Sequence, residues 1–465
     1  MKTINRLFDI LDNYVELYPK KQMLFAKENS VWQGLTALEV EEKTMQLACS
    51  LRRLHIGGTN FNLKEQSKIG LIANNRPEWI ITDFATQFSG AVLVPIYPSI
   101  TASEWEYILK EAEITILFIS DKAIYKKVKL IKDNIPSLQH IFSYDAIDGV
   151  KHWSELLQEF TQEEKAHIAQ IKNTIQPNHL ATIIYTSGTT GNPKGVMLSH
   201  QNIVSNVMNC MEVFNFCDNN ENTLSFLPLN HIFERTVMYI YLYKGVSVYF
   251  AEGMETIGNN LREVKPVVFT TVPRLLEKVY EKIDHKGSQL KGIRRKLFDW
   301  AVNLALRYDM DIPQSVSYKI QLLLADKLIY KKWREAVGGK IKAIVTGSAA
   351  CQVKLLRLFT AAKIIVMEGY GLTETSPVIS VNRFQSQNRK FGTVGTILQD
   401  VEVRLGDDGE IICRGPNVMM GYYLHPELNE EVLKDGWFHT GDIGTLVEKK
   451  FLKITKRKKA PASFI

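Results

Sequence analysis

Short apolar segments bounded by turn residues alternate with amphipathic segments in the first part of the chain. "KIGLIANN" (68–75), "AVLVPIYP" (91–98) and "ITILFIS" (114–120) have the length and composition of buried strands. A helical pattern of apolar residues occupies 102–113, between two of these segments. Strands that alternate with helices are typical of a sheet covered by helices. We therefore predict an α/β fold class.

The middle and the end of the chain differ from this pattern. Residues 275–335 mix charged and apolar residues at helical spacing, which predicts two or three surface helices. From about Gly392 the pattern changes again, because apolar and polar residues alternate over 401–405 and Asp408-Gly409 is a typical hairpin turn. These features predict a small antiparallel β unit after the α/β body.

Length and composition indicate a folded protein of several units. A chain of 465 residues exceeds one ordinary core, so we expect roughly three packing units. The apolar fraction of 45% and the charged fraction of 23% are those of a globular protein. The formal net charge of +7 suits an anionic ligand or a weak attraction to acidic lipid, and is too small to indicate nucleic acid as a partner.

Cysteine usage and hydropathy favour a cytoplasmic protein. The five cysteines are odd in number and include no C-x-x-C pair, so we expect neither a disulfide framework nor a zinc site. Residues 1–19 lack the continuous apolar core of a secretory leader. The most apolar stretch, 237–250, is interrupted by Lys244 and Gly245 and is shorter than the roughly 20 residues that span a bilayer. We expect no transmembrane anchor.

One polar segment concentrates the residue types that bind phosphate. "YTSGTTGNPKGV" (185–196) holds three glycines, four hydroxyl residues, one proline and one lysine between two apolar runs. It has three interpretations: a phosphate cradle, a nucleotidase P-loop or a polar surface loop. In a P-loop the lysine follows a glycine and a helix follows the loop. Here Lys194 follows Pro193, and both flanks are predicted to be strands, which argues against a P-loop.

The phosphate-cradle interpretation keeps a physical basis. Gly188, Gly191 and Gly195 let backbone N–H groups turn toward an anion without a Cβ penalty, and Lys194 adds positive charge. A mobile surface loop is the alternative for an isolated stretch of this composition. The loop alone leaves both interpretations open. Further donors are the hydroxyls of Thr186, Ser187, Thr189 and Thr190.

Five motifs in a fixed order resemble one enzyme superfamily. With "YTSGTTGNPKGV", the chain contains "LPLNHIFER" (227–235), "TVPRLLEKV" (271–279), "EGYGLTET" (368–375) and "DGWFHTGDIG" (435–444). Together they resemble the adenylate-forming (AMP-binding) superfamily of acyl-CoA synthetases, luciferases and peptide-synthetase adenylation domains. The resemblance implies a large N-terminal domain over 1–453, with two α/β subdomains that hold mixed sheets and a small β-barrel-like unit at about 392–450. Residues 454–465 would begin a hinge, with the C-terminal lid domain absent.

The resemblance also implies a reaction and a set of site residues. A carboxylate attacks the α-phosphate of ATP to give an acyl-adenylate, and a thiol then captures the acyl group. Thr186, Lys194, His231 and Glu374 would be catalytic. Thr186 and Glu374 would hold Mg²⁺, the adenine would stack on Tyr370, and Asp442 would accept the ribose hydroxyls. His231, Phe233 and Arg235 would line the acyl and thiol route. The nucleotide-binding set comprises Thr186, Ser187, Gly188, Thr189, Thr190, Gly191, Lys194, Gly347, Ser348, Ala349, Gly369, Tyr370, Gly371, Thr373, Glu374, Asp442 and Arg457.

The substrate expected from the resemblance is a medium- to long-chain fatty acid, with coenzyme A as acceptor. "VPRLLEKVYEKI" and "FDWA" resemble long-chain fatty acyl-CoA synthetases, and the helical stretch between Arg274 and Gly347 is long. The family's hinge carries an aspartate where this chain has Lys456, and its lid lysine has no counterpart here. We therefore expect ATP binding with slow adenylate formation. The alternatives are transfer to a carrier protein, or a nucleotide-binding protein with little turnover. A homodimer and peripheral contact with the inner membrane surface are further expectations.

Overall fold

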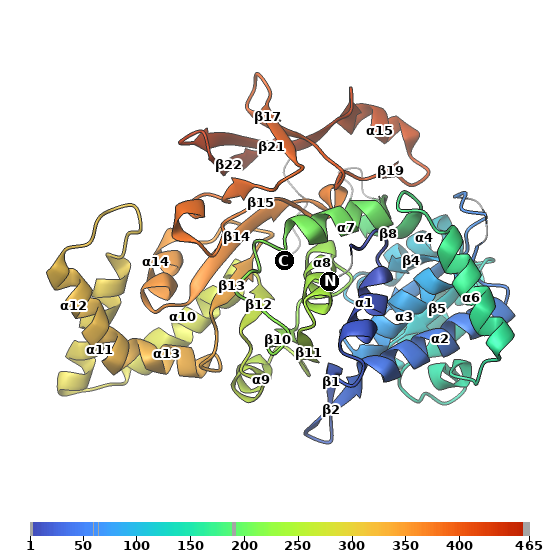
Figure 1. Ribbon diagram of the computed structural model, residues 1–465, viewed down its shortest axis with the longest axis horizontal. Coiled ribbons are helices and arrows are strands. Elements are labelled where there is room, and N and C mark those ends of the chain that lie inside the picture. The colour runs from blue at the N-terminus through green and yellow to red at the C-terminus, as the bar shows by residue number, and fades with distance from the viewer. Residues whose placement is uncertain (1–2, 59, 64, 188–191, 459–465) are drawn as a thin grey trace.

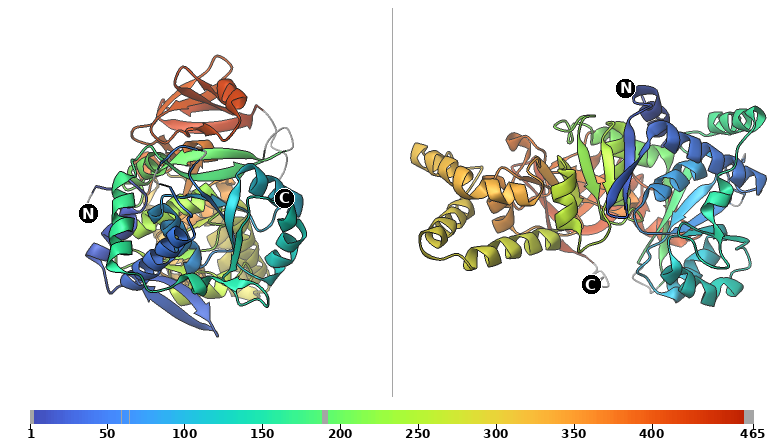
Figure 2. Two further views of the ribbon diagram at one scale, coloured as in Figure 1. Left: turned by 90° about the vertical axis from the view of Figure 1, so that its right-hand side faces the viewer. Right: turned by 90° about the horizontal axis from the view of Figure 1, so that it is seen from below.

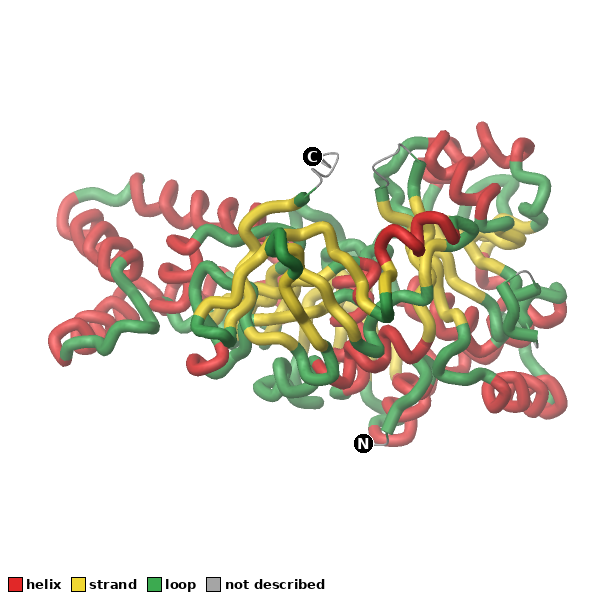
Figure 3. The backbone as a smooth tube through the Cα atoms, turned by 90° about the horizontal axis from the view of Figure 1, so that it is seen from above, coloured by secondary structure: helices red, strands yellow, loops and turns green. Residues whose placement is uncertain are grey.

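The computed structural model describes residues 3–58, 60–63, 65–187 and 192–458. Two β-sheets and their covering helices form the body, antiparallel strands lie above it, and a helical arm lies at one end (Figure 1). The strands of the two sheets form separate groups when the molecule is seen from above (Figure 3). Within the described ranges, each helix is too short or too polar to cross a bilayer.

The first sheet is mostly parallel and has eight strands within the described residues, in the order β19-β9-β8-β4-β3-β5-β6-β7. The strands predicted at 68–75, 91–98 and 114–120 are confirmed as β3, β4 and β5. Only the β8–β9 and β9–β19 pairings are antiparallel among the described pairs. The bounds are β3 (Lys68–Ile72), β4 (Val92–Pro95), β5 (Ile114–Ile119), β6 (His140–Ser143), β7 (Lys151–His152), β8 (Leu180–Thr186), β9 (Lys194–Ser199) and β19 (Gly421–Tyr422).

Helices cover both faces of this sheet. Side chains of α2, α3 and α6 pack on one face, and those of α4 and α5 pack on the other. The predicted helix at 102–113 is confirmed as α4, which begins after a capping box between Thr101 and Glu104. The bounds are α1 (Asp9–Leu17), α2 (Ala37–Arg53), α3 (Pro77–Phe88), α4 (Ala102–Glu111), α5 (Lys122–Ile131), α6 (Gln162–Thr174) and α7 (His200–Asn209).

The second sheet is parallel at its centre and antiparallel at both ends. Its order is β17-β18-β21-β22-β16-β15-β14-β13-β12-β10-β11-β1-β2, with β20 paired to β21. Helices α8 (Ile232–Tyr243), α9 (Ile257–Val264) and α14 (Val353–Ala361) pack against it. The strand bounds are β1 (Gln22–Glu28), β2 (Val31–Thr36), β10 (Asn222–Ser225), β11 (Ser247–Phe250), β12 (Val268–Thr271), β13 (Ala343–Thr346), β14 (Ile365–Gly371) and β15 (Val378–Val381).

The antiparallel β unit predicted near the end of the chain extends this second sheet. Gly409 has a φ of +80° in the turn between β17 and β18, so the hairpin predicted at Asp408-Gly409 is confirmed. Residues 454–457, expected to begin a hinge, lie in β22, where Arg457 pairs with Asp442 of β21. The bounds are β16 (Thr396–Ile397), β17 (Glu402–Leu405), β18 (Glu410–Arg414), α15 (Pro426–Val432), β20 (Leu433–Lys434), β21 (Trp437–Val447) and β22 (Phe451–Arg457).

The region 275–335 forms a helical arm that projects from the second sheet (Figure 2). In place of two or three helices, it contains four α-helices and one π-helical segment, Asp326–Tyr330. The arm has its own small apolar core, in which Phe298, Tyr330 and Trp333 are buried. The helices are α10 (Pro273–Ser288), α11 (Gly292–Leu306), α12 (Val316–Ala325) and α13 (Lys331–Ala336).

Candidate active site

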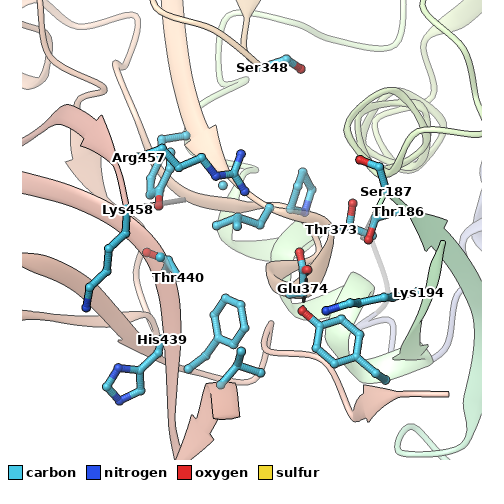
Figure 4. Close-up of a pocket in the computed structure, with 18 of the residues that line it drawn as sticks. Thr186, Ser187, Lys194, Ser348, Thr373, Glu374, His439, Thr440, Arg457 and Lys458 are labelled. Carbon is cyan, nitrogen blue, oxygen red and sulfur yellow. Dashed lines mark hydrogen bonds between the residues drawn. The ribbon is translucent and has the colours of Figure 1, made fainter. Parts of the chain in front are cut away.

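A cavity of about 760 Å³ lies where the two sheets approach each other. The β8–β9 hairpin of the first sheet provides one side, the end of β14 provides the floor, and β21 and β22 provide the opposite side (Figure 4). Four of the five motifs therefore meet around one space, whereas no residue of the motif at 271–279 lines it. Of the site residues expected from the sequence, those that line it are Thr186, Ser187, Lys194, His231, Gly347, Ser348, Gly369, Tyr370, Gly371, Thr373, Glu374 and Arg457.

The Gly/Thr-rich loop joins two antiparallel strands. Thr186 ends β8, Lys194 begins β9, and the two residues pair directly across the hairpin. A strand, not a helix, follows the loop, so the arrangement of a P-loop is excluded. The side chains of Thr186, Ser187 and Lys194 line the cavity. The expected phosphate contacts at Gly188, Thr189, Thr190 and Gly191 lie outside the described residues.

Glu374 places a half-buried carboxylate in the same space. It follows β14 in a single 3-10 turn, and its Oε1 accepts a hydrogen bond of 2.9 Å from the Tyr422 hydroxyl. Figure 4 shows Thr186, Glu374 and Lys194 turned toward the same part of the cavity. Within the described residues, no group of three His, Cys, Asp or Glu side chains could hold a metal. A cation here would need oxygen ligands from a bound molecule as well.

Tyr370 lines the cavity and is held in place by its hydroxyl. The hydroxyl donates to Asp442 Oδ2 at 2.8 Å, and burial raises the pKa of Tyr370 far above its ordinary value. The neighbouring Gly371 is required by the fold, because a Cβ atom there would lie 1.7 Å from the carbonyl oxygen of Pro377. The Tyr370 side chain is therefore held at the end of β14 by the hydrogen bond of its hydroxyl.

Asp442 does not line the cavity, although we expected it to accept the ribose hydroxyls. Only 6% of Asp442 is exposed. One carboxylate oxygen accepts from Tyr370, and the other lies 3.4 Å from Arg457 Nε. Burial raises the pKa of this carboxyl group. In this arrangement Tyr370 and Arg457 contact both carboxylate oxygens of Asp442.

His231 and Phe233 line the cavity, whereas Arg235 does not. His231 Nδ1 accepts from the backbone N–H of Phe233 at 3.1 Å, which leaves Nε2 as the protonated nitrogen. Burial lowers the pKa of His231 to about 4, so the imidazole is neutral at neutral pH. Arg235, which we expected beside the acyl route, is instead fully buried, and its guanidinium lies 2.5 Å from Asp83 Oδ1 of α3.

The segment "TGSAA" reaches the cavity with two of its residues. Gly347 and Ser348 line the space, and Ser348 has a φ of +67°. At this turn the chain leaves the cavity wall, so Ala349 is exposed and does not line it. The expected contribution of Ala349 to the nucleotide site is therefore not seen in this arrangement.

Several lining residues were missed by the sequence analysis. Lys458 Nζ lies 3.0 Å from Glu410 Oε2, and His439 Nδ1 lies 3.3 Å from the same oxygen. This charged cluster forms the rim opposite the β8–β9 hairpin (Figure 4). Lys458 follows Arg457 in a basic run, which was the one available signal. Tyr422, the partner of Glu374, comes from β19 and has no motif of its own.

Sequence comparison shows that the chain is similar to acyl-CoA synthetases and ligases. A family model described as "AMP-binding enzyme" matches residues 11–423. Long chain acyl-CoA synthetase 4 of Arabidopsis thaliana is 31% identical over 492 residues, which cover 97% of this chain and 71% of that protein. Long-chain-fatty-acid–CoA ligase 5 of Rattus norvegicus is 33% identical, and the match covers 94% of this chain and 65% of that protein.

Solved structures with the same fold come from similarly named proteins. The inhibitor-bound N-terminal domain of FACL13 from Mycobacterium tuberculosis matches with a TM-score of 0.74 at 19% identity, over 98% of this chain and 100% of that chain. A long-chain-fatty-acid-CoA ligase (FadD1) from Archaeoglobus fulgidus matches with a TM-score of 0.73 at 22% identity, over 98% and 85% of the two chains. These likenesses show that the fold is shared.

Proposed function

The chain belongs to the AMP-binding enzyme family, and from this premise we propose that it activates a medium- to long-chain fatty acid with ATP. In the first step a carboxylate oxygen attacks the α-phosphorus, an acyl–phosphate bond forms, and the bond to pyrophosphate breaks. In the second step the thiol of coenzyme A attacks the acyl carbonyl, a thioester forms, and AMP leaves. The observation that carries the proposal is the meeting of the hairpin residues Thr186 and Lys194 with Glu374 and Tyr370 in one cavity.

The residues present fit a nucleoside triphosphate. Phosphoryl-type displacement requires positioning and charge neutralisation more than covalent chemistry from the protein. Lys194 would neutralise phosphate oxygens, and the hydroxyls of Thr186 and Ser187 would donate hydrogen bonds to them. Tyr370 would pack against the base. For Asp442 to reach the ribose, the Tyr370 hydroxyl or Arg457 would have to move, because both now occupy its oxygens.

The same residues fit Mg²⁺. This ion usually binds one or two carboxylates, water and substrate phosphates, and the cavity offers one carboxylate, Glu374, beside the Thr186 hydroxyl. When bound, the ion would neutralise charge on the phosphate oxygens. Glu374 is held in place by the Tyr422 hydroxyl, so its carboxylate keeps one orientation. His231 presents a neutral imidazole with its Nε2 proton available to a carboxylate or carbonyl oxygen.

An apolar recess behind the cavity supports an aliphatic substrate. The recess has a volume of only about 20 Å³ in this structure. Four residues line both the recess and the cavity: Phe233, Gly369, Pro377 and Val378. A long acyl chain would have to part these side chains to enter. The remaining lining is apolar apart from Thr236, which favours a hydrocarbon chain over a polar acid. It consists of Cys210, Val213, Phe214, Thr236, Val237, Ile240, Val345 and Val381.

Acid-dependent exchange of pyrophosphate with ATP tests this proposal. Rates measured from acetate to palmitate should rise with chain length, and V237W, which fills the recess, should depress the palmitate rate more than the hexanoate rate. A matched control is V432W, because Val432 lines the cavity but not the recess. An optimum at acetate, or an equal effect of V237W on both acids, would contradict the assignment of the acid.

The acyl acceptor, the extent of turnover, the compartment and the oligomeric state are finer points that remain proposals. Coenzyme A is proposed as acceptor because relatives at 31% and 33% identity are named for it. A carrier-protein thiol is the competing acceptor, and mass analysis of thioester formed with each acceptor separates the two. Nucleotide binding with little turnover is the alternative to ligase activity, and calorimetric ATP binding without acyl-adenylate would favour it. We also propose a cytoplasmic homodimer, which sedimentation would test.

A further inference from the structure

The helical arm exposes an unusual concentration of large apolar side chains. Six of the eighteen large hydrophobic residues exposed among the described residues lie within 312–328. Val316 is 74% exposed, Leu323 is 64% exposed, and Ile320 is 53% exposed. We call this surface the α12 face, and it consists of Ile312, Val316, Ile320, Leu323, Leu324 and Leu328.

Helix α12 is apolar on both sides. Its inward side packs into the core of the arm through Tyr318, Leu322 and Ala325, and the Tyr318 hydroxyl donates to the carbonyl oxygen of Leu304 at 2.8 Å. Its outward side carries Val316, Ile320, Leu323 and Leu324, whose spacing places them on one stripe. A helix that is apolar all round is normally covered on all sides. The outward stripe therefore lacks a cover within the described residues.

Lysines border the α12 face. Lys319, Lys327 and Lys332 are exposed and form no ion pair with any described residue. The nearest acid in sequence, Asp326, is already neutralised by Arg334 at 2.5 Å and Lys363 at 2.7 Å. Exposed lysines therefore lie near the apolar residues in sequence, and their charge is not compensated by an ion pair within the described residues.

This combination selects an anionic partner with an apolar interior. Apolar side chains edged by lysines are typical of helices that lie in a membrane interface. A second copy of this chain is disfavoured, because a twofold contact through the α12 face would bring the same lysines together. The arm also projects from the end of the molecule, away from the antiparallel strands that border the cavity, so a flat surface can approach it (Figures 1 and 2).

We propose that the α12 face docks onto an anionic lipid bilayer. The aliphatic side chains enter the boundary between headgroups and acyl chains, and Lys319, Lys327 and Lys332 contact headgroup phosphates. Anionic headgroups attract such lysines over about a Debye length. The contact would hold the protein where fatty acids partition. The inference itself rests on this surface alone and does not depend on the proposed function.

Vesicle flotation tests the proposal. The full chain is mixed with phosphatidylcholine vesicles, with or without phosphatidylglycerol, and the protein that floats is quantified. The wild-type protein should float only with the anionic vesicles. The double variant I320E/L324E should reduce the partition coefficient at least about tenfold, because two aliphatic groups are lost from the bilayer. K319Q/K327Q should weaken flotation with anionic vesicles toward the level seen with neutral vesicles.

A matched control exists on another lysine-rich helix. Leu130 of α5 is 78% exposed and lies near Lys126, Lys127 and Lys129, so L130E makes the same chemical change outside the α12 face. L130E should float like the wild type. Equal loss in L130E, or no flotation of the wild-type protein, would overturn the proposal. So would a dimer that forms without vesicles and is dissociated by I320E/L324E, because the occupant would then be a second copy.

Binding and chemistry are separable in this design. Adenylate formation from a water-soluble hexanoate should be the same for the wild type and I320E/L324E in the absence of vesicles. Reduced flotation with unchanged hexanoate turnover would support docking through this face. Loss of both in the variant would indicate a general folding defect and would count against a separate docking surface.

Discussion

At the residue scale, the charge of the cavity depends on how its neighbours hold each side chain. Glu374 is oriented by the Tyr422 hydroxyl at 2.9 Å, and Lys194 Nζ lies 5.5 Å from the centre of the Tyr422 ring. Tyr422 therefore contacts both charged groups. A carboxylate and an ammonium group in one cavity suit a ligand that carries both phosphate and a cation.

Replacing Glu374 by glutamine should reduce acid-dependent pyrophosphate exchange by about a hundredfold, because an amide oxygen is a weak ligand for Mg²⁺. Excess Mg²⁺ should restore part of the rate. E431Q is the control, since Glu431 lines the same cavity from α15 and its side chain forms no hydrogen bond or ion pair with a described residue. A rate for E374Q equal to that for E431Q would remove Glu374 from the reaction.

A buried carboxyl group on α8 makes folding stability depend on pH. Glu234 is 1% exposed, accepts from Ser225 Oγ at 2.6 Å and from the Thr270 hydroxyl, and burial raises its pKa from 4.5 to about 7. Between these pH values the folded state binds more protons than the unfolded state. The contribution of Glu234 to the free energy of unfolding therefore falls as pH rises. The loss is complete above about pH 7 and amounts to about 3 kcal/mol.

E234Q removes this titration. The free energy of unfolding of E234Q relative to wild type should increase by about 3 kcal/mol between about pH 4 and about pH 8, measured by urea denaturation. E431Q changes an exposed glutamate and should follow the wild-type curve. Parallel curves for E234Q and wild type would contradict the raised pKa, because they would show that Glu234 has the same pKa in the folded and unfolded states.

Motifs predicted which residues meet, but not how they are oriented. Thr186, Lys194, Tyr370 and Glu374 converge on one cavity as expected. Asp442 could not be predicted to lie behind Tyr370, because that depends on a hydrogen bond between strands 72 positions apart. Arg235 belongs to one of the motifs, but its position is set by an ion pair with Asp83, which is distant in sequence. Their roles in the reaction remain proposals.

At the element scale, helix α8 connects the two sheets. Its Arg235 pairs with Asp83 of α3, donates to Thr182 Oγ1 of β8 at 2.9 Å, and stands beside Tyr239, whose hydroxyl also donates to Asp83. All of these groups are buried. The network therefore fixes α8, and with it His231 at the start of this helix, against the first sheet.

Breaking this network should be costly. R235M leaves a buried aspartate without its cation, and we expect a loss of about 3–5 kcal/mol in the free energy of unfolding. The double variant D83L/R235M removes both charges and should lose less than the sum of the single variants. K110A, which breaks an exposed pair with Glu106, should cost at most about 1 kcal/mol. Additive losses in the double variant would contradict a coupled pair.

Elements with strong local signals were predictable from the sequence. The capping box of α4 and the hairpin turn at Gly409 are set by neighbouring residues, so pattern and structure agree. The arm was predicted to hold two or three helices and contains four. The difference arises where the π-helical segment Asp326–Tyr330 divides one apolar stretch between α12 and α13. Such a division depends on packing against α11 and is not encoded in spacing alone.

At the scale of the whole molecule, the cavity exists only because two sheets and the antiparallel strands meet. The predicted β unit continues the second sheet through β15 and β16, which places Arg457 and Lys458 opposite the β8–β9 hairpin. Sheet order is set by pairings far apart in sequence, so the alternation of strand and helix patterns predicted the fold class but not this junction. The α12 face, at the far end of the arm, is separate from the cavity in the same views (Figures 1 and 2).

The most direct measurement is product analysis in a single turnover. Protein in molar excess over ATP is mixed with palmitate and Mg²⁺, quenched, and examined by mass spectrometry, so that even a slow first step is seen. We expect palmitoyl-AMP and pyrophosphate in equal amounts, formed only when palmitate is present, and conversion to palmitoyl-CoA with release of AMP when coenzyme A is added. Formation of ADP and phosphate, or release of pyrophosphate without palmitate, would contradict fatty-acid activation through an acyl-adenylate.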